Sequence, residues 1–353
     1  MSRRPACTGV STLKKITIND VAESAGVSVT TVSLVLSGKG RISSDTAQRV
    51  NQAIEHLGYV RNRSAASLRS RESGVIGVVV RDLTDAFYAE VIAGLGDTLE
   101  KHDKLLFLTQ SGRSGQHLRR CFESLLAQGV DGIVLAGGAE HAATLIEQAQ
   151  EQGVPLISAT RASSTEGIDA VRPDNMQAAR LATEYLIRRG HHTIAWLGGN
   201  GASLTRAERI GGYCTTLMQY SLPFRSDWIL ECDSDPQQAA EYTETLIHQH
   251  PNISAILCHN ASIALGCYFG LMRSGRGPGK EAMENYFERK IALVGFGDGP
   301  EANLTDPPLT VVNSSAREIG VLAARRLLQR LQEPTSPSQS IIVPPEMIVR
   351  GSA

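Results

Sequence analysis

The spacing of hydrophobic residues in the first sixty positions predicts three short helices. Between Ile18 and Ala25 the apolar residues recur at i, i+3, i+4 and i+7, which places them on one face of a helix. Gly26 follows and can adopt the left-handed conformation that often ends a helix. Thr17-Ile18-Asn19-Asp20 has the form of a capping box, so we expect this helix to begin at about Ile18.

The second predicted helix has one apolar side and one mixed side. We expect Ser28 to cap it and Gly38 to end it, with a third helix running from Ser43 or Ser44 to Leu57 before Gly58. Two short helices joined by a tight turn and braced by a third are typical of a helix-turn-helix, whose second helix fits the DNA major groove. Val32, Val35 and Leu36 are expected to face inward, and Val29, Thr30, Ser33 and Leu34 outward.

Beyond residue 72 the pattern changes to alternating strands and helices. A continuous apolar strand, Gly74 to Val80, is followed by a helix from Phe87 to His102, and a second series of the same kind begins near Pro173. Apolar strands alternating with helices predict parallel sheets covered on both faces. We therefore expect an α/β domain of two lobes, with a ligand site at the carboxyl ends of the strands, in the cleft between the lobes.

Charge separates the two regions. Residues 1–71 contain eleven Lys or Arg and four Asp or Glu, a net charge of +7, whereas the remainder contains 24 and 32, a net charge of −8. A basic head suits contact with a polyanion such as DNA, although a solvated basic face would give the same count.

Composition argues against several other classes of protein. The six cysteines are scattered and form no CxxC pair, so we expect reduced thiols, no metal and no cofactor. No apolar run of 18 residues and no export leader is present, so we expect a cytoplasmic protein that does not enter membranes. P-loop, dinucleotide and nucleophile-elbow motifs do not match, which argues against an enzyme, and a transport binding protein would need an export signal.

The run from Lys15 to Arg69, ITINDVAESAGVSVTTVSLVLSGKG and onward, resembles the DNA-binding headpiece of the LacI family of transcriptional regulators. The resemblance implies that Val29, Thr30 and Ser33 contact base edges and that Thr31 contacts backbone phosphate. Many members have an arginine where this chain has Leu34, so its operator should be read more by thymine methyl groups and hydroxyls, unless Leu34 is a core residue. We expect residues 1–14 to form a flexible basic tail and 15–61 the headpiece.

The resemblance also assigns residues 62–71. It implies that these residues form a hinge helix only when DNA and the hinge helix of a second subunit are both present. This helix would wedge Leu68 into the minor groove. Asn62 and Arg63 would contact the DNA backbone. The alternative is a passive linker.

The resemblance continues through residues 72–353, expected to form a periplasmic-binding-protein-like domain for ligand sensing and dimerisation. The runs RDLTDAFYAEVIAGL, QGVDGIVLAGG and EMIVRGSA are similar to family landmarks, and VRPDNMQAA, SLTRAERIGGYCTTL and SDWILEC look like the maltose-regulon repressor subgroup. We expect the crossovers between lobes near Arg172, Asn303 and Leu331. The N-lobe would then comprise about 72–172 and 303–331, and the C-lobe about 173–302 and 332–353.

Several residues match the family's ligand positions. The resemblance implies contacts from Phe87, Tyr88, Arg209 and Asn260, with Asp82, Arg161, Asp174 and Arg206 as further candidates that could equally be solvated or lobe-bridging charges. Two acids common in the family are replaced here by Gly297 and Ala261. Either Asp298 substitutes for the first of them, or the ligand differs in class from a sugar, or the response to a free ligand has weakened.

Together these features predict a repressor of carbohydrate-related genes that binds a pseudo-palindromic operator, double-stranded DNA, and responds to a small molecule such as a sugar or related metabolite. The chain ends without leucine heptads, so a homodimer is expected rather than a tetramer.

Overall fold

The computed structural model describes residues 16–38, 41–60, 72–112, 114–137, 142–162, 167–279 and 290–353. The chain divides into two compact units, Met1–Ser73 and Gly74–Ala353.

The first unit contains the three expected helices, α1 (Ile18–Ala25), α2 (Val29–Ser37) and α3 (Ser44–Leu57). Each ends at a glycine with φ near +62° or +63°, a conformation that costs glycine little. The side chains of Ser28 and Ser43 accept hydrogen bonds from the amides of Thr31 and Thr46 and so start α2 and α3. The predicted helix bounds and caps are therefore confirmed.

A small apolar core holds these helices together. One valine from each helix, Val21, Val32 and Val50, is completely buried at its centre. Val35 and Leu36 pack against this core from α2, as the pattern of the sequence predicts. The opposite side of α2 is left at the surface of the unit.

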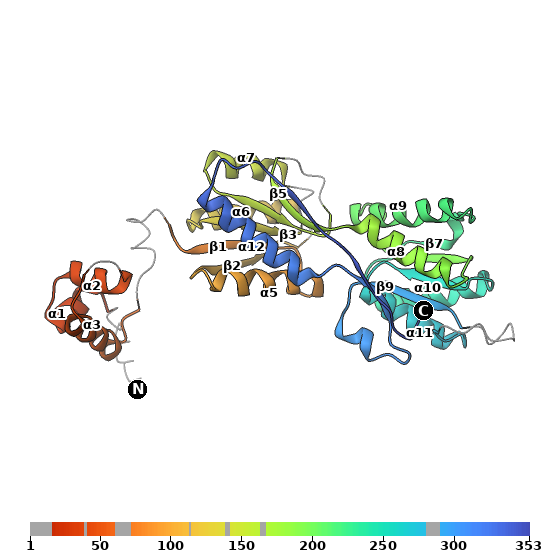
Figure 1. Ribbon diagram of the computed structural model, residues 1–353, viewed down its shortest axis with the longest axis horizontal. Helices are drawn as coiled ribbons and strands as arrows, with labels where there is room; N and C mark the ends of the chain where they lie inside the picture. Colours follow the sequence, from red (N-terminus) through yellow and green to blue (C-terminus); the bar gives the residue numbers. More distant parts are fainter. Residues whose placement is uncertain are drawn as a thin grey trace, which may run out of the picture. The chain divides into compact units, whose positions relative to one another are not determined.

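The second unit contains two six-stranded sheets, which form an N-lobe and a C-lobe (Figure 1). In the N-lobe sheet the order is β11-β5-β4-β3-β1-β2 and every pair is parallel. In the C-lobe sheet the order is β12-β10-β9-β8-β6-β7, and only the β10–β12 pair is antiparallel. The strands are β1 (Val75–Val80), β2 (Leu105–Gln110), β3 (Gly132–Ala136), β4 (Leu156–Ala159), β5 (Asp169–Pro173), β6 (Ile194–Leu197), β7 (Ile229–Leu230), β8 (Ala255–Cys258), β9 (Ala292–Phe296), β10 (Thr310–Asn313), β11 (Ser340–Val343) and β12 (Glu346–Ile348).

Helices cover both faces of each sheet, which explains why the central strands are apolar throughout. In the N-lobe, α5 and α12 pack on one face and α6 and α7 on the other; in the C-lobe, α10 and α11 face one side and α8 and α9 the other. The two-lobed α/β class is confirmed. The helices are α5 (Ala86–Glu100), α6 (Gly115–Ala127), α7 (Ala143–Glu151), α8 (Asn175–Arg188), α9 (Leu204–Gln219), α10 (Pro236–Gln249), α11 (Ala261–Arg273) and α12 (Ala316–Gln332), with 3-10 turns η2 (Ser226–Trp228) and η4 (Pro300–Asn303).

Two of the three crossovers between lobes differ from the expected positions. The chain passes from β5 to α8 at Asp174, but it returns between β10 and α12, at 314–315, and leaves again between β11 and β12, at 344–345. The expected crossovers near Asn303 and Leu331 were therefore wrong. The turn around Asn303 lies within the C-lobe, and the segment after Leu331 stays in the N-lobe because β11 pairs with β5.

Glycines allow paired helices to lie very close together. A Cβ atom at Gly94 of α5 would lie 2.1 Å from the carbonyl oxygen of Arg317 in α12, and one at Gly320 of α12 would lie 2.0 Å from that of Val91. The same arrangement joins α9 to α8, where a Cβ at Gly212 would lie 2.3 Å from the Met176 oxygen. Larger residues at these positions would force the helices apart.

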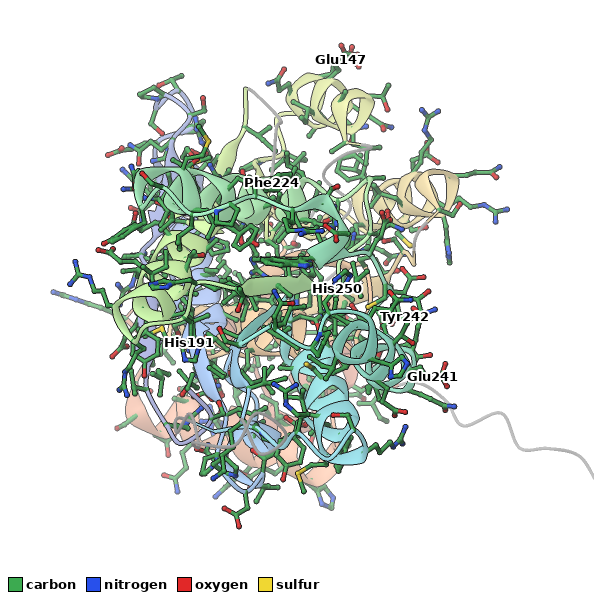
Figure 2. All side chains as sticks on the ribbon, turned by 90° about the vertical axis from the view of Figure 1, so that its right-hand side faces the viewer. Glu147, His191, Phe224, Glu241, Tyr242 and His250 are labelled. Atoms are coloured by element: carbon green, nitrogen blue, oxygen red, sulfur yellow. The ribbon has the colours of Figure 1, made fainter. Side chains whose placement is uncertain are left out.

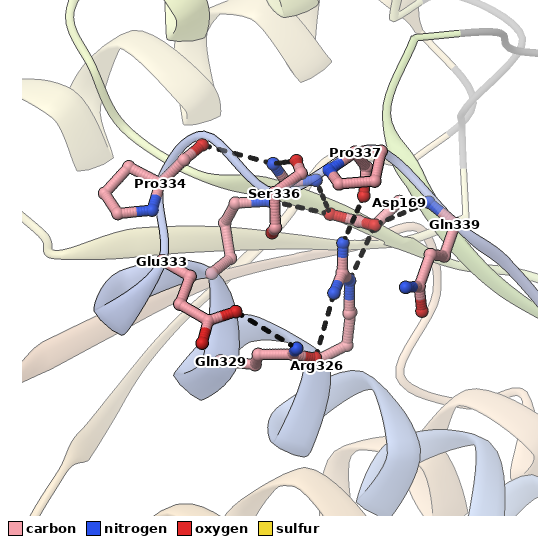
Figure 3. Close-up of polar contacts among 9 residues, drawn as sticks. Asp169, Arg326, Gln329, Glu333, Pro334, Ser336, Pro337 and Gln339 are labelled. Carbon is pink, nitrogen blue, oxygen red and sulfur yellow. Dashed lines mark hydrogen bonds and ion pairs between the residues drawn. The ribbon is translucent and has the colours of Figure 1, made fainter.

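A buried ion-pair cluster ties the last N-lobe segment to the sheet (Figure 3). The carboxylate of Asp169 on β5 binds Arg326 Nε at 2.7 Å and Arg330 Nη2 at 2.7 Å, both from α12. It also accepts from the backbone amide of Gln339 at 2.8 Å. Arg326 in turn donates to the carbonyl oxygen of Pro337 at 2.6 Å, so the chain from α12 to β11 is fixed through Asp169.

The surface carries separate apolar side chains. Figure 2 labels Phe224, which follows α9, and Tyr242 of α10, and these side chains are 51% and 37% exposed. Among the helices that the structure describes, none is both long enough and apolar enough to span a bilayer.

Candidate functional site

The outward side of α2 carries the residues that the sequence proposes for reading DNA. Val29 is 37% exposed, Thr30 is exposed, and Ser33 and Leu34 are half-buried. Val32, the buried residue of this helix, lies on the opposite side with Val35 and Leu36. α2 thus offers a short row of hydroxyl and methyl groups without an acidic side chain.

Among the remaining headpiece candidates, only Thr31 lies within the described residues. The hydroxyl of Thr31 lies 2.9 Å from that of Ser28, so Thr31 takes part in the cap at the start of α2. Asn62, Arg63 and Leu68 lie outside the residues that the structure describes.

In the second unit, polar residues meet at the carboxyl ends of the strands. Arg161, which follows β4, forms two hydrogen bonds of 2.6 Å with the carboxylate of Asp85, the N-cap of α5. Its guanidinium lies 4.4 Å from the ring centre of Phe87 and 5.2 Å from that of Tyr88. Burial alone would raise the pKa of Asp85, but the hydrogen bonds and charge of Arg161 outweigh burial and lower it. This pair is therefore neutralised internally.

Asn175 joins the two lobes at this place. Its amide nitrogen donates to the carbonyl oxygen of Arg161 in the N-lobe and to Glu208 of α9, both at 2.7 Å. Its amide oxygen accepts from Nε of Arg209 at 3.1 Å. Glu208 also pairs with Arg172 at 3.3 Å, so its charge is shared with that residue.

Arg209 is a buried cation. Only 9% of the residue is exposed, and its guanidinium donates to the carbonyl oxygen of His259 and lies 4.6 Å from the ring centre of Phe296. Burial, together with the charge of Arg161, lowers the pKa of Arg209 to about 9, against a smaller opposing effect of Glu208. At neutral pH the group keeps its proton, but in a setting that disfavours the charge.

His259 lies at the centre of this group of residues. It is 8% exposed and follows β8, with its ring 6.3 Å from that of Trp196. Burial, and then the charges of Arg209, Arg161 and Arg206, hold its pKa well below the usual value, so His259 is neutral near pH 7. Among the described residues, its Nδ1 atom has no hydrogen-bond partner.

Arg206 approaches from the first turns of α9. Its Nε donates to the carbonyl oxygen of Gly198 at 3.3 Å. A Cβ atom at Gly199, where φ is +86°, would lie 2.8 Å from Cδ of Arg206 and 3.0 Å from Cγ of His259. The glycines after β6 therefore let Arg206 and His259 pack closely against the backbone.

Four other candidates from the sequence are engaged in local structure. The carboxylate of Asp82 accepts from the amide and hydroxyl of Thr84, Asp174 caps α8, and Asn260 caps α11. The carboxylate of Asp298 pairs with Arg350 at 2.9 Å, so it does not simply replace the acid missing at Gly297.

Sequence reasoning missed four residues of this site: Asp85, Asn175, Glu208 and His259. Asn175 and His259 each follow a strand closely, which was the one available signal, whereas the roles of Asp85 and Glu208 depend on arginines distant in sequence. Within the described residues, no group of three His, Cys, Asp or Glu side chains is arranged to hold a metal ion.

Comparison with known families matches both units. Residues 17–62 match the family described as bacterial regulatory proteins, lacI family, and residues 73–350 match the periplasmic binding proteins and sugar binding domain of LacI family. The maltose regulon regulatory protein MalI of Escherichia coli (strain K12) is 52% identical, over 96% of this chain and 99% of the relative. Catabolite control protein A of Priestia megaterium is 29% identical, over 96% and 99%.

Solved structures show the same fold. A lac repressor dimer bound to operator and the anti-inducer ONPF matches with a TM-score of 0.85 and 25% identity, over 96% of this chain and 99% of that one. A transcriptional regulator CelR-cellobiose complex matches with a TM-score of 0.70 and 28% identity, over 96% and 100%. The resemblance noted from the sequence, including its subgroup, is confirmed along nearly the whole chain.

Proposed function

This chain belongs to the LacI family of DNA-binding transcriptional regulators, and we propose that as a homodimer it binds a pseudo-palindromic operator and represses genes of carbohydrate metabolism. The observation that carries the proposal is α2, a capped helix with one side packed on a core and the other carrying Val29, Thr30, Ser33 and Leu34. The name of the E. coli relative supports the class of genes, and the operator-bound lac repressor dimer supports the assembly.

The same relatives are regulators, and we propose that this protein acts in the cytoplasm without catalytic activity.

Asn62 and Arg63 would contact the DNA backbone beside Thr31. Because two copies related by a two-fold axis present two copies of α2, the operator should contain two inverted half-sites.

Selection of random duplexes by the purified protein tests the reading role of α2. We expect a two-fold motif, and we expect Leu34→Ala to weaken the preference for one base pair in each half-site by about 1 kcal/mol, because an apolar contact with a thymine methyl group is removed. Leu304→Ala, which changes an 83% exposed leucine of the other unit, is the matched control. Equal enrichment of every sequence by the wild-type protein would contradict the proposed function.

Leu68→Ala tests the proposed minor-groove wedge. A leucine that unstacks a base step contributes only where the duplex is kinked, so specific affinity should fall about tenfold more than non-specific affinity. Fluorescence anisotropy with the selected operator and with a scrambled duplex measures both. Losses of the same size on the two duplexes would show that residue 68 belongs to a passive linker.

We propose that the small-molecule effector binds at the strand ends, among Phe87, Tyr88, Arg161, Arg206 and Arg209. Asn175 supports this location, since it contacts both lobes and hydrogen-bonds Arg209. A ligand that binds one arrangement of the lobes more tightly shifts the population of that arrangement, and with it the spacing of the hinge segments. Asp82, Asp174, Asn260 and Asp298 would shape the site from its edge.

A further inference from the structure

The charged groups around His259 are unbalanced, and this bears on the class of effector. Arg161 has its own carboxylate in Asp85, and Arg172 has Glu208. Arg209 and Arg206 differ: within the described residues, neither guanidinium has a carboxylate at ion-pair distance, and their acceptors are the neutral oxygens of Asn175, His259 and Gly198. Neither positive charge is therefore directly paired, and Glu208, which Arg172 shares, offsets that of Arg209 only in part.

The lack of counter-charge is costly for Arg209 because it is buried. A buried charge without a partner is strongly disfavoured, and a guanidinium forms its strongest hydrogen bonds with carboxylate or phosphate oxygens. Burial, and then the charge of Arg161, lowers the pKa of Arg209. An oxyanion placed beside Arg209 would supply the missing charge.

Arg206 lies beside the same residue, because a Cβ atom at Gly199 would lie 2.8 Å from Cδ of Arg206 and 3.0 Å from Cγ of His259. Arg209 donates to the carbonyl oxygen of His259, so the two arginines without a paired carboxylate both lie beside this histidine. His259 itself is neutral, which leaves its unpartnered Nδ1 able to hydrogen-bond a ligand without adding charge. Two arginines and one neutral imidazole suit an oxyanion and its neighbouring hydroxyl.

The positions after β9 and at the start of α11, where the family commonly has acids, carry no negative charge here. The C-lobe strand β9 is followed by Gly297, which has φ +93° and no side chain, and α11 begins with Ala261. The next acid, Asp298, is neutralised by Arg350. From these two positions a neutral sugar would find no free carboxylate acceptor for its hydroxyl groups.

We propose that the effector of this protein is an anionic saccharide, carrying a phosphate or carboxylate group that binds Arg206 and Arg209. The inference rests on the proposed function, because it assigns a ligand class to the proposed effector site. Phosphate esters and sugar acids share the oxyanion that these arginines recognise, and the choice between them is a matter of experiment.

The test is titration of the full-length protein with four probes at constant ionic strength: glucose 6-phosphate, glucuronate, glucose and inorganic phosphate. Tryptophan fluorescence reports binding, since Trp196 lies beside His259. We expect at least one of the two anionic sugars to bind about tenfold more tightly than glucose, and inorganic phosphate to compete with it. Which anionic sugar binds tighter distinguishes a phosphate ester from a carboxylate.

Variants separate the role of charge from that of folding. Arg206→Gln, at a half-buried position, should weaken binding of the anionic sugar about tenfold and leave glucose unchanged, and Arg209→Gln should do the same if circular dichroism shows a native fold. Arg188→Gln removes an arginine that is 71% exposed on α8 and should change nothing. Arg209→Lys keeps the charge and should recover part of the affinity.

The outcomes separate the two proposals. Equal affinity for glucose and the anionic sugars, unchanged anion binding in Arg206→Gln, or no binding of any anion at millimolar concentration would each overturn the anionic ligand. If in those cases a neutral sugar still alters operator affinity, the regulator function stands. If the selection finds no operator, the proposed function fails whatever the probes do.

Discussion

Replacing Asp169 by alanine should lower the free energy of unfolding by about 3–5 kcal/mol, because it leaves two arginines without their carboxylate in the interior of the N-lobe. Asp169 and Arg326 are 2% and 3% exposed, and the carboxylate serves Arg326, Arg330 and the amide of Gln339 at once. Because Arg326 is almost completely buried, its guanidinium would lose this partner without becoming fully hydrated.

Asp169→Asn separates charge from volume. The amide is nearly the same size, but its NH₂ group would face guanidinium donors, so we expect a loss of the same order. Glu147→Ala changes an exposed acid of α7 in the same lobe (Figure 2) and should cost little. Urea unfolding of the full-length protein, followed by circular dichroism, measures all three. A loss below about 1 kcal/mol for Asp169→Ala would show that the cluster contributes little to stability.

Gly94→Ala should destabilise the N-lobe by about 3 kcal/mol, although alanine is the better helix former. The added methyl group would lie 2.1 Å from the Arg317 carbonyl oxygen, a backbone atom that can yield only if α5 and α12 separate. Separation would also disturb Val91 and Leu95, which are completely buried in the lobe core.

Gly96→Ala is the matched control for this prediction. Gly96 lies in the same helix, but a Cβ atom there would have Cδ1 of Leu106 as its nearest neighbour at 3.6 Å, an ordinary contact. The substitution should therefore stabilise the protein by up to about 1 kcal/mol through helix propensity. Opposite signs for two glycines of one helix, read from the same urea curves, are the expected result. Similar stabilisation by both would mean that α5 and α12 pack less closely than the structure shows.

The headpiece could be predicted closely because its signals are local. Ser28 and Ser43 cap the helices that directly follow them, and Gly26, Gly38 and Gly58 end helices of 8, 9 and 14 residues. No contact between distant segments is needed to decide these boundaries. The alternation of apolar strands with helices likewise predicts the two-lobed class.

The crossovers and much of the ligand site depend on long-range contacts. β11 belongs to the N-lobe because Ser340 to Val343 pairs with β5 in parallel, about 170 residues away in sequence. Arg350 binds Asp298 from the far end of the chain, and Asn175 acquires its role only when Arg161 and Arg209 approach it. Residue type and order contain no direct sign of these partners.

The three crossovers at Asp174, 314–315 and 344–345 determine how the sensing domain could be exchanged between regulators. Neither lobe is one continuous stretch of the gene, because each takes strands from both sides of a crossover. A chimera that receives a foreign C-lobe would need three matched junctions. In a fusion with a single junction after 314, helix α12 and the edge strand β11 of the N-lobe would come from the other protein.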